Sequence, residues 1–247
     1  AVFEVQNLFA QTLTGADAGK IIPGSERIIL DATTQLPAYV EFQKGRGPKT
    51  TDFALWLKGS LNMSAALGLS LINTETDAIG YKHVRYEQTY NGFPVNHSMI
   101  LVHSINGSVV SFNGEFVTRL SVKTESSISE SSALEMAKKS IGAQLYKWEL
   151  KSEEAFLKRE QHDEKATFFP TAERMLVKTQ ANVYVFGFRF DIYAHKPVSR
   201  QYVFVDAMTG AILGKEERIH EATVTGSATT AYSGARTIKT DFNGVSY

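Results

Sequence analysis

The sequence predicts an α+β protein made of two modules, each an antiparallel β-sheet packed against a helix, followed by a short β segment. Short runs of alternating apolar and polar residues, separated by Gly, Asn and Pro, are typical of antiparallel sheet. Two stretches carry apolar residues at helical spacing. The polar segment 121–127 lies between them and is the expected module boundary.

In the first half, two strands are expected within residues 27–42, where Asp31, Thr33 and Thr34 favour a turn between them. A helix is expected from Thr51 to about Leu61, because its apolar residues recur at spacings of three, one and four. We expect Asp52 to cap the first turn of this helix, which then packs on the sheet that follows.

The clearest local pattern is a hairpin that begins at Tyr81. Apolar and polar residues alternate up to Tyr90, and Asn91-Gly92 supplies the positive φ angles of a tight turn. Further turns are expected at Asn106-Gly107 and Asn113-Gly114, so this region should meander through three or four antiparallel strands.

The second half should begin with a helix from Ser129, whose hydroxyl can cap it, to Gly142, which should end it. The charged stretch 151–165 is mixed in sign and reads as a solvated helix face or loop. Strands are then expected at 175–178, 182–193, 201–206 and 211–214. In the second of these strands five apolar side chains share one face that needs a partner, and the helix is the natural cover: Tyr184, Phe186, Phe188, Phe190 and Ile192.

Composition excludes several functions. The 247 residues hold 26 Lys and Arg against 26 Asp and Glu, and this balance argues against nucleic acid or an anionic membrane as the main partner. With no Cys, the chain has no disulfide, thiolate nucleophile or cysteine-ligated metal. Its longest apolar runs are too short to span a bilayer.

No catalytic set can be assembled from the sequence. A zinc helix needs two His one turn apart beside a Glu, but His220-Glu221 is the only His-Glu pair and no second His follows it. His97 and His103 are expected to share a sheet region in a structural or surface role rather than as metal ligands. Nucleophile elbows and glycine-rich phosphate loops are absent. We therefore expect no catalytic or metal-binding residue in this chain.

The hairpin sequence also resembles a known family. His83-Val-Arg-Tyr-Glu-Gln88-Thr-Tyr-Asn-Gly92-Phe-Pro-Val95, together with residues 107–114, is similar to the fungalysin/thermolysin propeptide domain. Residues 129–141, Tyr146-Lys-Trp148 and Tyr202-Val-Phe-Val-Asp206-Ala-Met-Thr-Gly210 resemble a PepSY domain. In thermolysin-like metallopeptidases these modules precede the catalytic domain in this order, and residues 222–247 resemble the first strands of that domain.

This resemblance implies a division of the chain into five parts. They are an N-terminal β extension (1–50), the fungalysin/thermolysin propeptide domain (51–120), the PepSY domain (128–217), a cleavage junction (218–221) and the start of the peptidase domain (222–247). The two sheet-and-helix modules, 51–120 and 128–217, are expected to be cystatin-like. The chain would then be the prosegment of a zymogen, an intramolecular chaperone and inhibitor whose partner is the cognate peptidase domain.

The resemblance further implies zinc and calcium in the peptidase domain, and secretion to an extracellular or periplasmic location with the signal peptide removed or outside this sequence. We expect cleavage near Glu221-Ala222. Ile219, His220 and Glu221 are the candidate contacts to the peptidase cleft, although they can equally belong to a plain linker. Two alternatives stay open: a stand-alone PepSY-type inhibitor or binding module, and an enzyme of unknown type.

Arg85 and Gln88 are the candidate docking residues of the hairpin, on what we interpret as an exposed strand face. Strand geometry alone accounts for both equally well. The paired sheet faces as a whole are also expected docking surfaces.

Overall fold

The computed structural model describes residues 10–218 and, for the backbone only, 223–230 and 234–241. The described chain forms two compact units. Unit 1 comprises the residues up to Thr124 together with Met175–Val185, and unit 2 comprises Glu125–Arg174 and the residues from Phe186 onward. The fold is mixed α+β, dominated by β-sheet and with few helices, as the sequence predicts.

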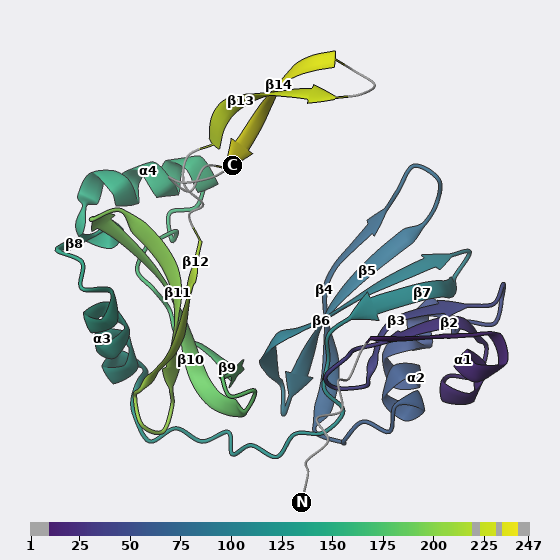
Figure 1. Ribbon diagram of the computed structural model, residues 1–247. Helices are drawn as coiled ribbons and strands as arrows, with labels where there is room; N and C mark the ends of the chain where they lie inside the picture. The colour runs from purple at the N-terminus through teal and green to yellow at the C-terminus, as the bar shows by residue number, and fades with distance from the viewer. Residues whose placement is uncertain (1–9, 219–222, 231–233, 242–247) are drawn as a thin grey trace, which may run out of the picture. The chain divides into compact units, whose positions relative to one another are not determined.

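Unit 1 is built on an antiparallel sheet with the strand order β4-β5-β6-β7-β3-β2-β1 (Figure 1). Its strands are β1 (Gln11–Thr14), β2 (Ser25–Leu30), β3 (Pro37–Phe42), β4 (Leu67–Thr76), β5 (Lys82–Tyr90), β6 (Phe93–Ile105) and β7 (Ser108–Gly114). Three turns join strands as predicted. Asp31 Oδ1 accepts the amides of Thr33 and Thr34 between β2 and β3. Asn91-Gly92 and Asn106-Gly107 take positive φ angles in the next two hairpins.

The turn predicted at Asn113-Gly114 is wrong, because both residues lie inside β7. Asn113 is paired on both sides, with Leu101 of β6 and with Tyr39 of β3. Gly114 is needed there for a different reason: a Cβ atom at this position would collide with the backbone carbonyl of Met99.

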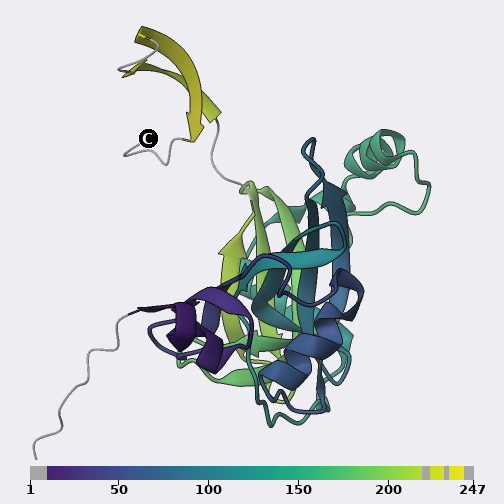
Figure 2. The same cartoon turned by 90° about the vertical axis from the view of Figure 1, so that its right-hand side faces the viewer.

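The described part of unit 1 contains two α-helices. The predicted one is α2 (Phe53–Ser60), preceded by the 3₁₀ turn η1 (Thr50–Asp52), and it lies along one face of the sheet (Figure 2). Asp52 does not cap it, because this residue already has helical backbone angles as part of the 3₁₀ turn. The short helix α1 (Gly15–Ile21) was not predicted. The core under α2 is a ring cluster in which Phe53 and Trp56 meet Phe112 at 5.3 and 6.2 Å between centroids.

Unit 2 contains the antiparallel strands β8-β10-β11-β12. Their bounds are β8 (Leu145–Tyr146), β10 (Tyr184–Lys196), β11 (Ser199–Asp206) and β12 (Ile212–Glu217), and the division between the units falls within β9 (Glu173–Lys178) and β10. The predicted helix is α3 (Glu130–Ile141), capped by the Ser129 hydroxyl and ended by Gly142 at φ 67°. The charged stretch forms α4 (Lys151–Gln161), which the 3₁₀ turn η2 (Lys147–Glu149) precedes.

The core of unit 2 follows the predicted alternation along β10. Phe186, Phe188, Phe190 and Ile192 are buried, whereas Tyr184, the fifth residue predicted for this face, is half-buried. Helix α3 lies against the sheet (Figure 1) and buries Ala133, Leu134 and Ala137. A turn at Asp206–Gly210 joins the predicted strands on either side of it: the Asp206 carboxylate accepts the amides of Met208 and Thr209, and Gly210 has φ 76°.

Beyond unit 2's sheet, β13 (Thr223–Thr230) and β14 (Gly234–Asp241) form an antiparallel hairpin. Among the described strands, this hairpin pairs with no other. Its assignment to the start of a peptidase domain stays a prediction.

Candidate docking surfaces

Two sheet faces of the described residues carry clusters of polar side chains. Within residues 10–218, no three His, Asp or Glu side chains gather closely enough to hold a metal ion. In the same residues, no helix has the length and apolarity of a membrane span.

The first candidate is the outer face of unit 1, which we define by His83, Arg85, Met99, Leu101 and His103 on β5 and β6. Cross-strand pairing puts Arg85 opposite Leu101, and His83 opposite His103. Arg85 is exposed and Met99 is 46% exposed. Among the described residues of unit 1 no helix lies over this face, whereas α2 covers the other one (Figure 1). The register also places Glu87 opposite Met99 and Glu75 opposite His83. The outer face thus combines one exposed cation and two carboxylates with accessible apolar surface.

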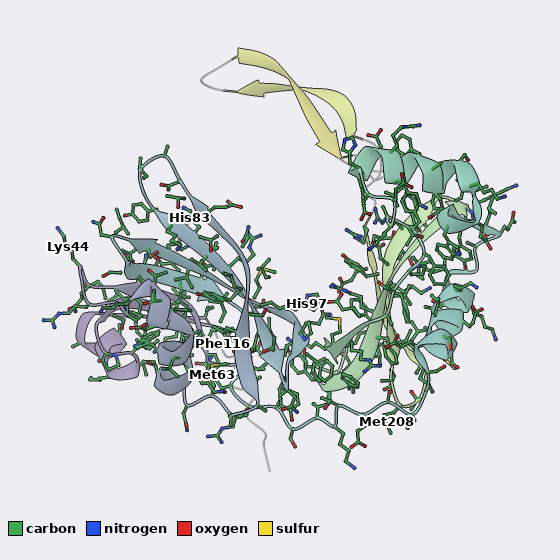
Figure 3. The ribbon with its side chains drawn as sticks, turned by 180° about the vertical axis from the view of Figure 1, so that it is seen from behind. Lys44, Met63, His83, His97, Phe116 and Met208 are labelled. Carbon is green, nitrogen blue, oxygen red and sulfur yellow. The ribbon has the colours of Figure 1, made fainter. Side chains whose placement is uncertain are left out.

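A histidine pair occupies the end of the outer face near the β4–β5 hairpin (Figure 3). The Nδ1 atoms of His83 and His103 are 2.7 Å apart, and their rings meet edge to face. His83 Nε2 lies 3.3 Å from Asp77 Oδ2, and His103 Nε2 lies 3.4 Å from Asn113 Oδ1. His97 and His103 share strand β6, as expected, and the side chain that His103 meets is His83 of β5.

Gln88 does not belong to a docking surface. Its side chain is fully buried. Its Nε2 donates to the Val117 carbonyl at 2.7 Å, and its Oε1 accepts the Val117 amide at 2.8 Å. The prediction of an exposed face was wrong because Gln88 has the inward phase of β5, with Val84 and Tyr90, where a polar group persists only if it is hydrogen-bonded. Gln88 therefore fastens the segment after β7 to the sheet.

The second candidate is a face of unit 2 that carries arginine and tyrosine side chains. It lies on the side of β10 and β11 opposite the buried phenylalanines, and it comprises Arg189, Asp191, Tyr193, Arg200, Tyr202 and Arg218. The Asp191 carboxylate accepts Nε and Nη2 of Arg200 at 3.0 and 2.8 Å, and it also pairs with Arg218. These hydrogen bonds to Asp191 raise the pKa of the Arg200 guanidinium above its usual value.

Guanidinium groups stack on both tyrosines of this face. Arg189 and Arg218 lie 4.5 and 4.4 Å from the Tyr202 ring centroid, and Arg200 lies 5.0 Å from that of Tyr193. A cavity of about 350 Å³ opens beside them, lined also by residues of α4 and by the segment Thr167–Thr171. The side chains are thus held in fixed positions around a hollow, which is an arrangement suited to recognition.

This face of unit 2 was not expected from the sequence. The alternation of β10 contained the signal, because Arg189, Asp191 and Tyr193 occupy the phase opposite the phenylalanines. Pairing with Arg200 and Tyr202 of the next strand depends on register, which the sequence does not specify. Of the predicted junction 218–221, the described residues include Arg218 alone. The candidate cleft contacts Ile219, His220 and Glu221, and Ala222 at the expected cleavage bond, lie outside the described residues.

Comparison with known proteins defines the class of this region. The Fungalysin/Thermolysin Propeptide Motif matches residues 68–116, which run from β4 through β7. The chain therefore contains a thermolysin-like propeptide region. Arg85 and the histidine pair lie within it, and so does Gln88.

The relatives found among curated proteins are thermolysin-like enzymes. Bacillolysin of Bacillus subtilis (strain 168) is 31% identical over 183 residues, which are 72% of this chain and 33% of that protein. Bacillolysin of Bacillus amyloliquefaciens is 34% identical over 166 residues (66% and 29%). Thermolysin of Alicyclobacillus acidocaldarius subsp. acidocaldarius is 29% identical over 158 residues (62% and 26%). The chain spans about a third or less of the length of these relatives.

Among solved structures, the Bacillus megaterium YpeB C-terminal domain is similar at a TM-score of 0.33 and 12% identity, with 84% of this chain and 81% of that chain covered. A similarity this weak supports no conclusion about fold or function.

Proposed function

We propose that this chain is the prosegment of a secreted thermolysin-like metallopeptidase and acts on the cognate peptidase domain as intramolecular chaperone and inhibitor. The propeptide motif at 68–116 carries the proposal. In this proposal residues 51–120 and 128–217 are the two prosegment modules, the latter of the PepSY type, and 222–247 begin the peptidase domain. Zinc and calcium belong to that domain, and cleavage falls near Glu221-Ala222.

The physical reason for a chaperone is the cost of non-local β structure. Such topologies fold slowly, because distant segments must meet before their contacts stabilise them. A preformed sheet with an accessible face lowers this barrier for a neighbouring domain. The outer face of unit 1 offers such a surface, with Arg85 and Met99 exposed on it.

Refolding tests the chaperone role. The denatured cognate peptidase domain is diluted into buffer with and without the chain, and recovered peptidase activity is measured. We expect the chain to raise the yield and then to inhibit the refolded enzyme. Equal yields with and without the chain, and no inhibition, would sink the proposal.

A charge reversal at the outer face tests the docking surface. Arg85→Glu should weaken inhibition, because it reverses the one exposed cation among the residues that define this face. Arg46→Glu, in the exposed turn after β3, is the matched control and should inhibit like the unaltered chain. Equal inhibition by all three proteins would remove Arg85 from the interface.

A stand-alone PepSY-type binding module is the second candidate. The hairpin β13–β14 has no partner strand in the described chain, and this favours the prosegment over the stand-alone module. An isolated two-stranded hairpin is marginally stable in water, and further strands are expected beside it.

A further inference from the structure

Arg218, the first residue of the predicted junction, is held at three points. The Arg218 amide donates to the Arg200 carbonyl at 2.8 Å. Its guanidinium pairs with the Asp191 carboxylate and stacks on the Tyr202 ring at 4.4 Å. Backbone, charge and ring contacts therefore all fix this residue to β10 and β11.

The groups that hold Arg218 are themselves held. Arg200 binds the Asp191 carboxylate through two nitrogens, so the carboxylate cannot rotate freely. Arg189 also stacks on Tyr202, and Glu173 pairs with Arg189. The side chains of Arg218 and Asp191 are 33% and 30% exposed, so solvent screens the pair only in part. We call Arg218, Asp191, Arg200 and Tyr202 the anchor.

An anchored Arg218 limits where the following residues can go. A chain extends by at most about 3.6 Å per residue, so Glu221, three residues further on, lies within about 11 Å of Arg218 whatever its conformation. A peptidase that cuts the bond after Glu221 must therefore bring its active site to the edge of the unit 2 sheet. The proposed cleft contacts Ile219 and His220 are closer still.

We infer that the anchor is a positioning device: Asp191, Arg200 and Tyr202 fix Arg218 so that the peptidase meets one particular bond at a set number of residues beyond it. This inference rests on the proposed function. Asp191 and Tyr202 touch no reacting atom and act only through Arg218. The same fixation supports inhibition, since a segment held in advance loses less conformational entropy on entering the cleft.

An insertion tests whether the anchor sets the distance, in residues, between Arg218 and the bond that is cut. Two glycines placed between Arg218 and Ile219 leave the anchor intact and move the junction outward by two residues. The altered chain and the unaltered chain are each incubated with the peptidase, and mass spectrometry identifies the first bond cut. We expect cleavage at the same number of residues after Arg218, hence two residues earlier in the original sequence. Cleavage that stays at the original bond would show that the local sequence selects it and would overturn the inference.

Removal of the anchor gives a second readout. Arg218→Gln should spread cleavage over several bonds and weaken inhibition about tenfold, because one more residue must be ordered on binding. Arg174→Gln, which removes the exposed ion pair with Glu130 in the same unit, is the matched control and should behave like the unaltered chain. Circular dichroism checks that each variant is folded.

Different results would overturn the proposed function and the positioning role of the anchor. If the unaltered chain neither inhibits the peptidase nor is cut at a defined bond, the proposed function falls and the anchor with it. If the unaltered chain inhibits and Arg218→Gln matches it in both inhibition and cleavage, only the anchor falls.

Discussion

Units 1 and 2 both place a helix on one face of an antiparallel sheet, but they fill the space between the two differently. In unit 1 the helix contributes large rings, with Phe53 buried and Trp56 beside it, and both meet Phe112 of the sheet. In unit 2 the helix contributes smaller side chains, Ala133, Leu134 and Ala137, and the sheet supplies the phenylalanines of β10. A core needs a filled volume, and either element can provide it.

The uncovered faces differ as well. The outer face of unit 1 leaves Met99 half-exposed beside the exposed Arg85. The corresponding face of unit 2 is a network in which Asp191 is paired with Arg200 and Arg218. The first face is adaptable, whereas the second is fixed in advance, and this difference suits a surface that guides folding and a surface that positions a junction.

The largest losses of stability should come from truncating a large buried side chain in the core of each unit. Phe53→Ala and Phe188→Ala should each lower the free energy of unfolding by about 3–5 kcal/mol. The two tryptophans of the chain report on different units, Trp56 on unit 1 and Trp148 on unit 2. In denaturant titrations followed by fluorescence, with Trp148→Phe or Trp56→Phe as background, each deletion should shift the midpoint of its own unit most. Equal shifts of both signals would contradict the separation into two cores.

A smaller effect, confined to unit 1, is expected from Gln88→Leu. The change leaves the part-buried amide and carbonyl of Val117 without their partners and should lower unit 1's stability by about 1–3 kcal/mol. The matched control is Asn73→Ala on β4, the strand next to β5. It removes an exposed hydrogen bond between the side chains of Asn73 and Glu75, and it should change the stability by no more than about 0.5 kcal/mol. Urea titration of the Trp56 signal measures both. A Gln88→Leu protein as stable as the unaltered chain would deny Gln88 its fastening role.

Two glycines should respond with opposite signs. Gly142 has φ 67° at the end of α3, so Gly142→Ala should destabilise unit 2 by about 1 kcal/mol. Gly59 lies in α2 with open space around its Cα, so Gly59→Ala should stabilise unit 1 by roughly 0.5–1 kcal/mol. Thermal unfolding of the two variants gives both signs, and a stabilising Gly142→Ala would refute the αL cap.

The smallest effect depends on pH. The Thr34 amide, with help from the Thr34 hydroxyl and the Thr33 amide, holds the pKa of Asp31 below its usual value. A lowered pKa in the folded state means that this carboxylate stabilises unit 1 above its unfolded pKa of about 3.9, and that the contribution is lost as the pH falls through the folded value. Asp31→Ala should cost about 0.5–1 kcal/mol near pH 7 and nothing in strong acid. Melting curves at several pH values test this, and a constant difference would disprove it.

The sequence predicts what short-range chemistry determines. The hairpin turns with Asn-Gly, the Ser129 cap, the Gly142 stop and the phenylalanine face of β10 all formed, since each depends on a few adjacent residues. Asn113-Gly114 failed because its strand is paired on both sides by segments far away in the sequence. The surfaces were harder: Arg218 meets Asp191 across 27 positions, and only the strand register brings them together. The two-module, cystatin-like division stays a prediction.

Unit 1 is not continuous along the chain. Its first part ends at Thr124, yet Met175–Val185 belongs to it, and Val95 of β6 pairs with Leu176 of β9. At about 5–20 residues per second, a ribosome needs roughly 3–12 s to make the intervening stretch and this returning segment. During that interval the Val95 edge of the nascent sheet lacks its parallel neighbour. The ribosome therefore cannot complete unit 1 before it has made residues Glu125–Arg174 of unit 2. Although unit 1 begins first along the chain, its last segment is made after much of unit 2.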